Sequence, residues 1–247
     1  KAGAATFGNW YYLQYGKVEG MANIVKAIRR SNDIFFYKVG EKTGVEKIKK
    51  WSDIFGLGKH TKIGLDEVEG IIPSTFWKKE ILKDNWYLGD TYNLSIGQGY
   101  VGTTPLQMAL VTNVFANGGY LCRPQLLKQD VKTRDRASLP NCTKLPISQK
   151  TIDLIREGMK QACSTGGTGW PLFDFAVGKT KIKTACKTGT AESHAVSGMP
   201  HAWITVFAPF ENPEIAVTVL VEEGGQGSDV AGPIAKEILK VYFERSQ

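Results

Sequence analysis

In the first half of the chain, apolar residues recur three and four positions apart, which is the spacing of one face of a helix. Between residues 21 and 40 this pattern is carried by Ile24, Ala27 and Ile28 and then by the apolar, aromatic run 34–37. The sequence therefore predicts one continuous helix over residues 21–40.

A second helix is predicted directly after the first. Thr43 and Glu46 have the spacing of a capping box, in which each side chain bonds a backbone N–H near the helix start. Gly40 is expected to end the preceding helix, because glycine is common at helix C-termini. The tripeptide Lys42-Thr43-Gly44 is therefore interpreted as a corner between two helices.

Two further helices have recognisable starts, and two segments have no regular period. Thr104 is a predicted N-cap with Pro105 at the first helical position, and Ser148 is the predicted N-cap of a later helix. Residues 53–86 are rich in Gly, Pro and short polar runs, so we expect irregular structure there. Residues 128–146 are polar and are expected to form a loop or a weak hairpin.

The C-terminal third changes from a helical to an alternating pattern. Residues 181–190, 202–207 and 215–221 are predicted strands, and residues 229–244 return to helical spacing. The short connection between the last two strands is typical of antiparallel neighbours. Helices followed by three strands and a closing helix predict an α+β fold, with helices packed on an antiparallel sheet.

Composition narrows the class of protein. The chain has 247 residues, 42% of them hydrophobic, which suits one packed domain covering the whole chain. Its net charge of +7 comes from 31 basic residues interleaved with 24 acidic ones, without a zinc-finger or recognition-helix pattern. Nucleic acid is therefore a weaker expectation than an anionic envelope, a membrane surface or a carboxylate substrate.

Cysteine and histidine placement argues against a metal or redox cofactor. The four cysteines form no Cys-x-x-Cys pair, and the three histidines are far apart in the sequence. A disulfide between Cys122 and Cys142 is one alternative, but we expect unpaired buried thiols. No run of about 18 apolar residues is present, so no membrane-spanning segment is predicted.

A second Lys-Thr-Gly, at residues 187–189, has a different context because it lies near the end of a predicted strand. Strand alternation places Lys187 and Gly189 on one face and Thr188 and Thr190 on the other. A substrate backbone could lie beside Gly189, and backbone N–H groups at the strand edge could stabilise an oxyanion. The alternative is a strand end with a glycine turn, which the tripeptide alone does not exclude.

Three segments together resemble one family. They are Ser31-Asn32-Asp33 in SNDIFFYKVG, the segment LSIGQGYVGTTPLQMA at 94–109, and KTGTAE at 187–192. In this order they resemble the transpeptidase domain of class B penicillin-binding proteins, with elongation-type penicillin-binding protein 2 as the nearest type. The resemblance implies a fold like that of penicillin-binding proteins and serine β-lactamases, over nearly the whole chain.

The resemblance also implies roles for individual residues. Catalytic roles would fall to Ser31, Asp33 and Lys187, and substrate-binding roles to Thr188, Gly189 and Thr190. Ser31 would relay a proton beside the nucleophile, and Asp33 would hold the polar position that Asn occupies in the commoner Ser-x-Asn pattern. The threonines would bind the donor's terminal carboxylate, and the Thr190 N–H would form half of an oxyanion hole.

The family's Ser-x-x-Lys nucleophile segment is absent from this chain. No serine is followed three residues later by lysine, and Thr75-x-x-Lys78 is expected to lie in irregular structure without a helix N-terminus. We expect the nucleophile upstream of Lys1, in a longer protein of which this domain is an N-terminally incomplete part. An N-terminal membrane helix, also outside this chain, would anchor the protein in the periplasm or at the outer face of the cytoplasmic membrane.

The implied activity is peptidoglycan cross-linking by serine acyl transfer, with no cofactor. Its expected partners are peptidoglycan stem peptides, β-lactam antibiotics, the upstream part of the same protein and the membrane glycan polymerase of the elongation complex. Two alternatives remain at this point: a serine β-lactamase, and a non-catalytic β-lactam sensor or wall-binding module of the same fold.

Overall fold

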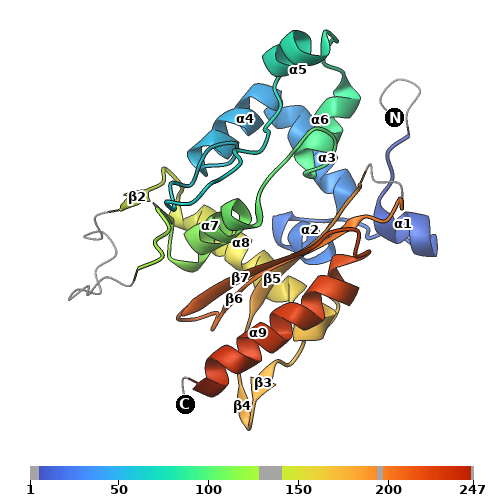
Figure 1. The fold of residues 1–247 in the computed structure, drawn as a ribbon. Coiled ribbons are helices and arrows are strands. Elements are labelled where there is room, and N and C mark those ends of the chain that lie inside the picture. Colours follow the sequence, from blue (N-terminus) through green and yellow to red (C-terminus); the bar gives the residue numbers. More distant parts are fainter. Residues whose placement is uncertain (1–5, 128–140, 194–196, 246–247) are drawn as a thin grey trace.

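A three-stranded antiparallel sheet organises the molecule (Figure 1). This computed structural model describes residues 6–127, 141–193 and 197–245. The strands β5 (Ala185–Ala191), β6 (His201–Ala208) and β7 (Ile215–Val221) lie in sequence order, with Gly189 directly opposite Trp203 across β5 and β6. Helix α9 (Gly232–Arg245) packs on one face of the sheet, and α7 (Pro105–Ala116) and α8 (Gln149–Ala162) pack on the other. The predicted α+β fold with helices flanking an antiparallel sheet is confirmed.

Strand alternation divides the core into two layers. Cys186 and Val206 are fully buried on the α9 side, in one cluster with Leu239 of that helix. Ala185 and Phe207, each one residue away in sequence, are buried on the opposite side together with Met159 of α8. The sheet therefore buries apolar surface on both faces, which fixes the strand register and thereby the direction of each side chain of β5.

The predicted continuous helix over residues 21–40 is wrong, because the chain breaks it near the middle. Helix α2 (Ile24–Arg30) ends at Ser31, whose backbone is left-handed with φ 48°. Helix α3 (Asp33–Thr43) begins immediately afterwards, and the Asn32 side chain caps it by accepting a hydrogen bond from the Phe35 N–H. The apolar spacing runs through both helices and hides the corner between them.

The corner at residues 42–44 exists, but the predicted capping box does not form. Helix α3 continues past Gly40 to Thr43, and Gly44 starts α4 (Val45–Ile54) with φ 81° and no side-chain cap. A positive φ of this kind favours glycine, so the turn depends on Gly44 and does not need Thr43. The Glu46 carboxylate instead accepts a hydrogen bond from the Thr75 hydroxyl, at 2.6 Å.

Part of the segment predicted to be irregular is helical. Ser74 caps α5 (Thr75–Leu82), so Thr75 does lie at a helix N-terminus, contrary to expectation. The buried Lys78 ammonium is paired with carboxylates, 2.8 Å from Asp90 and 3.0 Å from Asp84. Because those carboxylates hold the ammonium and the Thr75 hydroxyl bonds Glu46, Thr75-x-x-Lys78 does not form a nucleophile and base pair.

The helix starts predicted at Thr104 and Ser148 are confirmed. Thr104 and Gln107 form the capping box of α7, and the Ser148 side chain caps α8. The strand expected from residue 181 begins at Ala185, and the part of segment 128–146 at 128–140 lies outside the described residues. The remaining elements are α1 (Trp10–Tyr15), α6 (Leu88–Ser95), β1 (Tyr120–Cys122), β2 (Cys142–Lys144), η2 (Trp170–Leu172), β3 (Ala176–Val177), β4 (Thr180–Lys181) and η3 (Gly227–Ala231). Strands β1 and β2 pair as an antiparallel hairpin.

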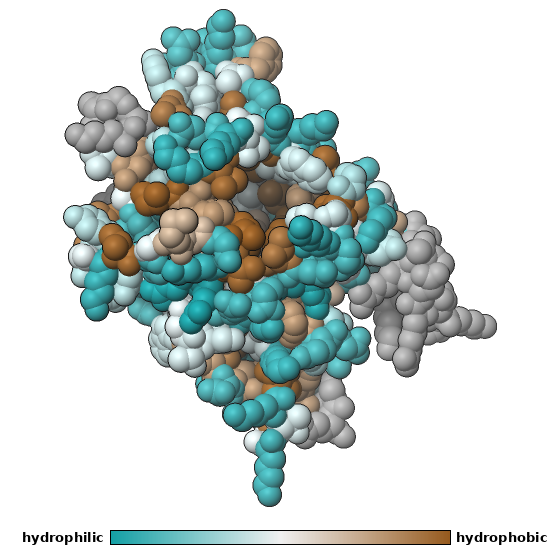
Figure 2. All heavy atoms as spheres, turned by 180° about the vertical axis from the view of Figure 1, so that it is seen from behind, coloured by the Kyte–Doolittle hydropathy of each residue, from teal (hydrophilic) through white to brown (hydrophobic). Residues whose placement is uncertain are grey.

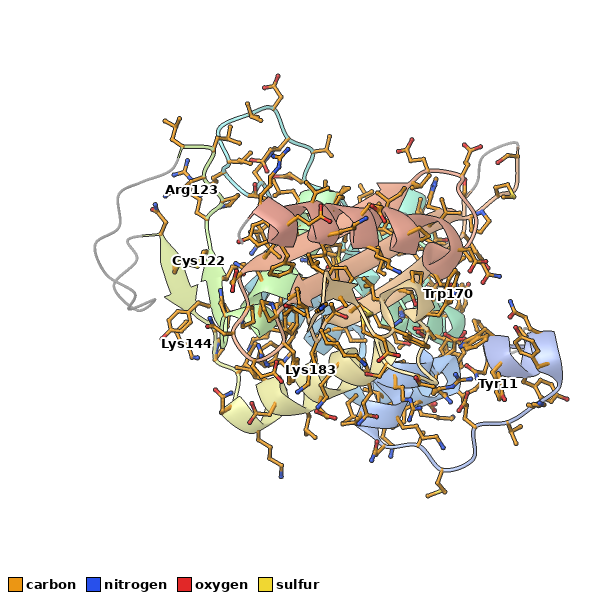
Figure 3. All side chains as sticks on the ribbon, turned by 90° about the horizontal axis from the view of Figure 1, so that it is seen from below. Tyr11, Cys122, Arg123, Lys144, Trp170 and Lys183 are labelled. Carbon is orange, nitrogen blue, oxygen red and sulfur yellow. A yellow bond between two sulfur atoms is a disulfide. The ribbon has the colours of Figure 1, made fainter. Side chains whose placement is uncertain are left out.

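The expectation of unpaired thiols is wrong, because all four cysteines form disulfides. Cys122 lies directly opposite Cys142 in the β1–β2 hairpin, which Figure 3 shows at the end of the molecule opposite Tyr11 of α1. Cys163, at the end of α8, bonds Cys186 of β5. The second disulfide therefore ties the end of a helix to β5, one residue before Lys187.

Apolar side chains also reach the surface. Figure 2 shows hydrophobic residues gathered in the middle of the face behind the view of Figure 1, between hydrophilic regions. Helices α1 and α5 carry strongly exposed examples, with Leu13 at 72% and Phe76 at 74% exposure. Single exposed apolar side chains are common on soluble proteins and indicate no binding site by themselves.

Candidate active site

Ser31 lies at the tight corner between α2 and α3. Its backbone has φ 48° and ψ 53°, a left-handed conformation that non-glycine residues seldom adopt. The turn is closed by hydrogen bonds from the Ser31 N–H to Ile28 and from the Asn32 N–H to Ala27. Such conformations concentrate at functional sites, where the surrounding structure holds them in place.

Contacts from the segment before and at the start of α1 hold Asp33, two residues after Ser31. The Asn9 side-chain oxygen accepts from the Asp33 N–H at 3.0 Å, and the Trp10 N–H donates to the Asp33 carboxylate at 3.2 Å. The Trp10 indole N–H donates to the Arg30 carbonyl at 2.9 Å. The corner is therefore fixed from both sides, which limits how far Ser31 and Asp33 can move.

Lys187 of β5 meets Ser31 although the two residues are 156 positions apart. The Lys187 Nζ donates to the Ser31 Oγ at 2.5 Å and to the Thr188 carbonyl at 2.7 Å. The structure thus brings the first and third motifs of the sequence into one site. Lys42 of the other Lys-Thr-Gly is an exposed residue near the end of α3, at the corner with α4.

Burial and mutual attraction set the charges of the site. Loss of hydration lowers the pKa of Lys187 to about 8, and the negative charge of Asp33 opposes this shift. Burial also raises the pKa of Asp33, while the Trp10 N–H and the Lys187 ammonium act in the opposite direction. A lysine with a pKa of about 8 is charged at neutral pH and yet close to giving up its proton, which suits proton transfer.

The two threonines face away from Lys187, as strand alternation predicts. The Thr188 hydroxyl donates to the Thr168 hydroxyl at 2.9 Å. The Thr190 hydroxyl accepts from the Gly227 N–H at 3.4 Å. A hydroxyl has one donor and two acceptor positions, so Thr190 keeps its O–H for an anionic group.

Packing within the sheet favours glycine at position 189. A side chain there would begin 3.2 Å from the Trp203 Cβ in the neighbouring strand, closer than nearly all such contacts in proteins. The absence of a side chain at this position therefore has a packing reason, in addition to any space it leaves for a substrate.

Sequence reasoning did not assign a role to Gln98 or Thr168, which also contact β5. The Gln98 amide nitrogen donates to the Thr190 carbonyl at 2.9 Å, and its oxygen accepts from the Glu192 N–H at 3.1 Å. Gly97-Gln98-Gly99 was identified as part of a family segment, but the sequence does not show that Gln98 contacts Thr190, 92 residues later. Thr168 lies in the glycine-rich run that follows α8, which indicates only a helix end.

Two arginines of α2 hold the loop that contains Thr168. The Arg29 guanidinium donates to the Thr165 carbonyl at 2.8 Å, and the Arg30 guanidinium donates to the Gly166 carbonyl at 2.9 Å. Glu19 pairs with Arg30 at 2.8 Å. The helix that ends at Ser31 is thereby connected to the loop that contacts Thr188, so both sides of the site share one support.

Within the described ranges, no three His, Cys, Asp or Glu side chains are grouped so that they could hold a metal ion. None of the helices in those same ranges combines the length and hydropathy of a membrane span.

Comparisons with known proteins agree with this geometry. A model of the penicillin-binding protein transpeptidase domain matches residues 1–240. Peptidoglycan D,D-transpeptidase MrdA of Salmonella typhimurium strain LT2 is 33% identical over 254 residues, covering 95% of this chain and 40% of the relative. The chain therefore spans about two fifths of the length of this curated relative.

Solved structures have the same fold. The complex of penicillin-binding protein 2 (PBP2) and MreC from Helicobacter pylori matches with TM-score 0.82 and 33% identity, over 100% of this chain and 44% of the other. A structure described as the structural coordination of polymerization and crosslinking by a peptidoglycan synthase complex matches with TM-score 0.80 and 28% identity. The match covers 97% of this chain and 40% of the other. With the family model, these similarities establish that the chain belongs to the transpeptidase domain family of penicillin-binding proteins, of the PBP2/MrdA type.

Proposed function

We propose that this chain forms the donor-binding part of the active site of a peptidoglycan D,D-transpeptidase. The observation that carries the proposal is the hydrogen bond between Lys187 and Ser31, which brings a motif on β5 together with a motif at the α2–α3 corner, 156 positions away in the sequence. The attacking serine would be supplied by a part of the protein outside these 247 residues, because no Ser-x-x-Lys occurs in them.

In the proposed reaction, the donor stem peptide lies along β5. Its terminal carboxylate binds near the Thr188 and Thr190 hydroxyls, with Lys187 supplying positive charge. Its penultimate D-alanine carbonyl accepts a hydrogen bond from the Thr190 N–H, which would stabilise the oxyanion. Gly189 leaves space for the donor backbone beside Lys187.

Proton transfer would use the Ser31 and Lys187 pair. The hydroxyl of the attacking serine, which is not Ser31, adds to the carbonyl. The bond to the terminal D-alanine breaks, and the leaving amine takes up a proton. The amine of a second stem peptide then displaces the serine, which recovers its proton. Ser31 accepts a hydrogen bond from Lys187 and keeps its own O–H to pass on, so it can relay a proton in either direction.

Asp33 would act through Lys187. Its carboxylate favours the charged form of the lysine, and hydrogen bonds from the backbone hold it in place. Asp33 would thus keep the ammonium charged at neutral pH despite its loss of hydration, which is a positioning and electrostatic role.

The relatives support a place in cell-wall elongation. The H. pylori relative is described in a complex with MreC, and another relative in a peptidoglycan synthase complex. We propose corresponding partners for this protein: an elongation scaffold, a membrane glycan polymerase, and the remainder of its own chain. It would act in the periplasm, at the outer face of the cytoplasmic membrane, where β-lactams that mimic the donor would reach it.

Labelling with a fluorescent penicillin tests the division of the active site. We expect no covalent adduct with the isolated 247-residue chain, and one adduct per molecule in the longer protein that includes a Ser-x-x-Lys segment. A cooperative thermal transition of the isolated chain serves as the control for folding. A stoichiometric adduct with the isolated chain would show that a nucleophile lies within it, and rapid release of hydrolysed penicillin would indicate a β-lactamase.

A further inference from the structure

The outer edge of β5 is occupied by a side chain. One edge of this strand pairs with β6, and in the part of the chain that the structure describes, no strand pairs with the other. The Gln98 amide lies there, donating to the Thr190 carbonyl at 2.9 Å and accepting from the Glu192 N–H at 3.1 Å. A neighbouring strand would make the same two kinds of hydrogen bond with this edge.

Gln98 is held in this position from its own loop. Its N–H donates to the Asn93 carbonyl at 2.9 Å, and Gly97 and Gly99 on either side have φ 74° and 71°. Helix α6, which precedes the loop, packs against α3, and α3 begins at Asp33. The amide therefore connects the helical side of the site to the sheet side, next to the proposed oxyanion donor.

A donor peptide that pairs with β5 needs the Thr190 carbonyl, to which Gln98 donates. In an antiparallel pair, a residue whose carbonyl accepts from a given N–H also donates its own N–H to the carbonyl of that same residue. If the reacting carbonyl binds the Thr190 N–H, the donor's N–H is directed at the Thr190 carbonyl. In this structure that carbonyl accepts from Gln98.

We propose that Gln98 competes with the donor for the edge of β5 and has to release Thr190 and Glu192 before acylation. This inference rests on the proposed function, because it assumes that the donor pairs with β5. Gln98 would then determine how readily a donor enters the site without taking part in the bond changes. A state that has to open before binding lowers the apparent affinity by the fraction of molecules that are open.

The test is the second-order rate constant for acylation of the longer, nucleophile-containing protein by a penicillin whose side chain carries an amide N–H. Replacing Gln98 by leucine removes both hydrogen bonds at similar size. We expect a rise of about 5- to 20-fold, the population ratio that two partly exposed hydrogen bonds can sustain. An unchanged or lower rate constant would overturn the proposal, because it would make Gln98 neutral or a support for the strand.

Matched variants separate this outcome from other failures. Gln149→Leu, at an exposed position of α8 remote from β5 in sequence, is the control and is expected to leave the rate constant unchanged. If Gln98→Leu does not fold, Gln98→Glu serves instead, since its carboxylate cannot donate to the Thr190 carbonyl, and a faster acylation is again expected. If the unaltered protein is not acylated at all, the proposed function fails; if it is acylated and the Gln98 variants are no faster, only the competition by Gln98 is refuted.

Discussion

Replacing Lys187 by alanine is expected to lower the second-order rate constant for acylation by penicillin by about 10²- to 10³-fold. The variant loses the ammonium that donates to Ser31 and leaves that hydroxyl without its partner for proton transfer. It also removes the positive charge that would attract the donor carboxylate. The measurement is the time course of adduct formation, in the protein that includes the attacking serine, over a range of penicillin concentrations.

The other Lys-Thr-Gly of the same chain provides the control. Lys42 is exposed near the end of α3, beside the corner with α4, and Lys42→Ala removes the same side chain from the same tripeptide. Its effect on the rate constant is expected to stay within about a factor of two, since substitutions at exposed sites have small effects. A comparable loss in both variants would contradict the assignment of the site to β5.

The acylation rate should also depend on pH through Lys187. Its pKa is about 8, so above that pH the ammonium is lost and the rate is expected to fall, approaching tenfold per pH unit. Asp33→Asn removes the negative charge that supports the ammonium, which lowers the pKa of Lys187 further and moves the fall to lower pH. The measurement is kcat/KM for both proteins between about pH 6 and 10.

The free energy of unfolding, measured over the same pH range, distinguishes the expected fall in acylation rate above about pH 8 from a loss of rate caused by unfolding. Lys187 has a pKa of about 8 in the folded protein and 10.5 as its reference value, so between these values the unfolded chain binds more protons. This group alone therefore makes the folded state more stable as pH rises from about 8 to 10.5, while activity falls.

A fall in activity that stays at the same pH, or moves to higher pH, in Asp33→Asn would refute the role of Asp33.

Elements with strong local signals could be predicted from the sequence. Helix α7 has Thr104 and Gln107 in a capping box, and β6 and β7 alternate between buried and more exposed positions. The corner at Ser31 was missed because the helical spacing of apolar residues continues across it. Its left-handed backbone is supported by distant groups, the side chain of Asn9 and the ammonium of Lys187, which no local pattern encodes.

Only the candidate-site residues that lie in family motifs could be predicted from the sequence. Ser31, Asp33 and Lys187 were identified through family resemblance, and the fold brings them together. The role of Gln98 depends on a contact across 92 residues, and that of Thr168 on how the loop after α8 packs against β5. The Cys122–Cys142 disulfide was only the second alternative, and the Cys163–Cys186 disulfide was not anticipated, because strand register and packing bring these residues together and spacing along the sequence does not show this.

The most direct test of the proposed site is a crystal structure of the penicillin adduct of the longer, nucleophile-containing protein. We expect the ester carbonyl oxygen within hydrogen-bonding distance of the Thr190 N–H, and the penicillin carboxylate beside the Thr188 and Thr190 hydroxyls. We also expect Lys187 to remain next to Ser31. An adduct whose carbonyl and carboxylate make no contact with β5 would contradict the account.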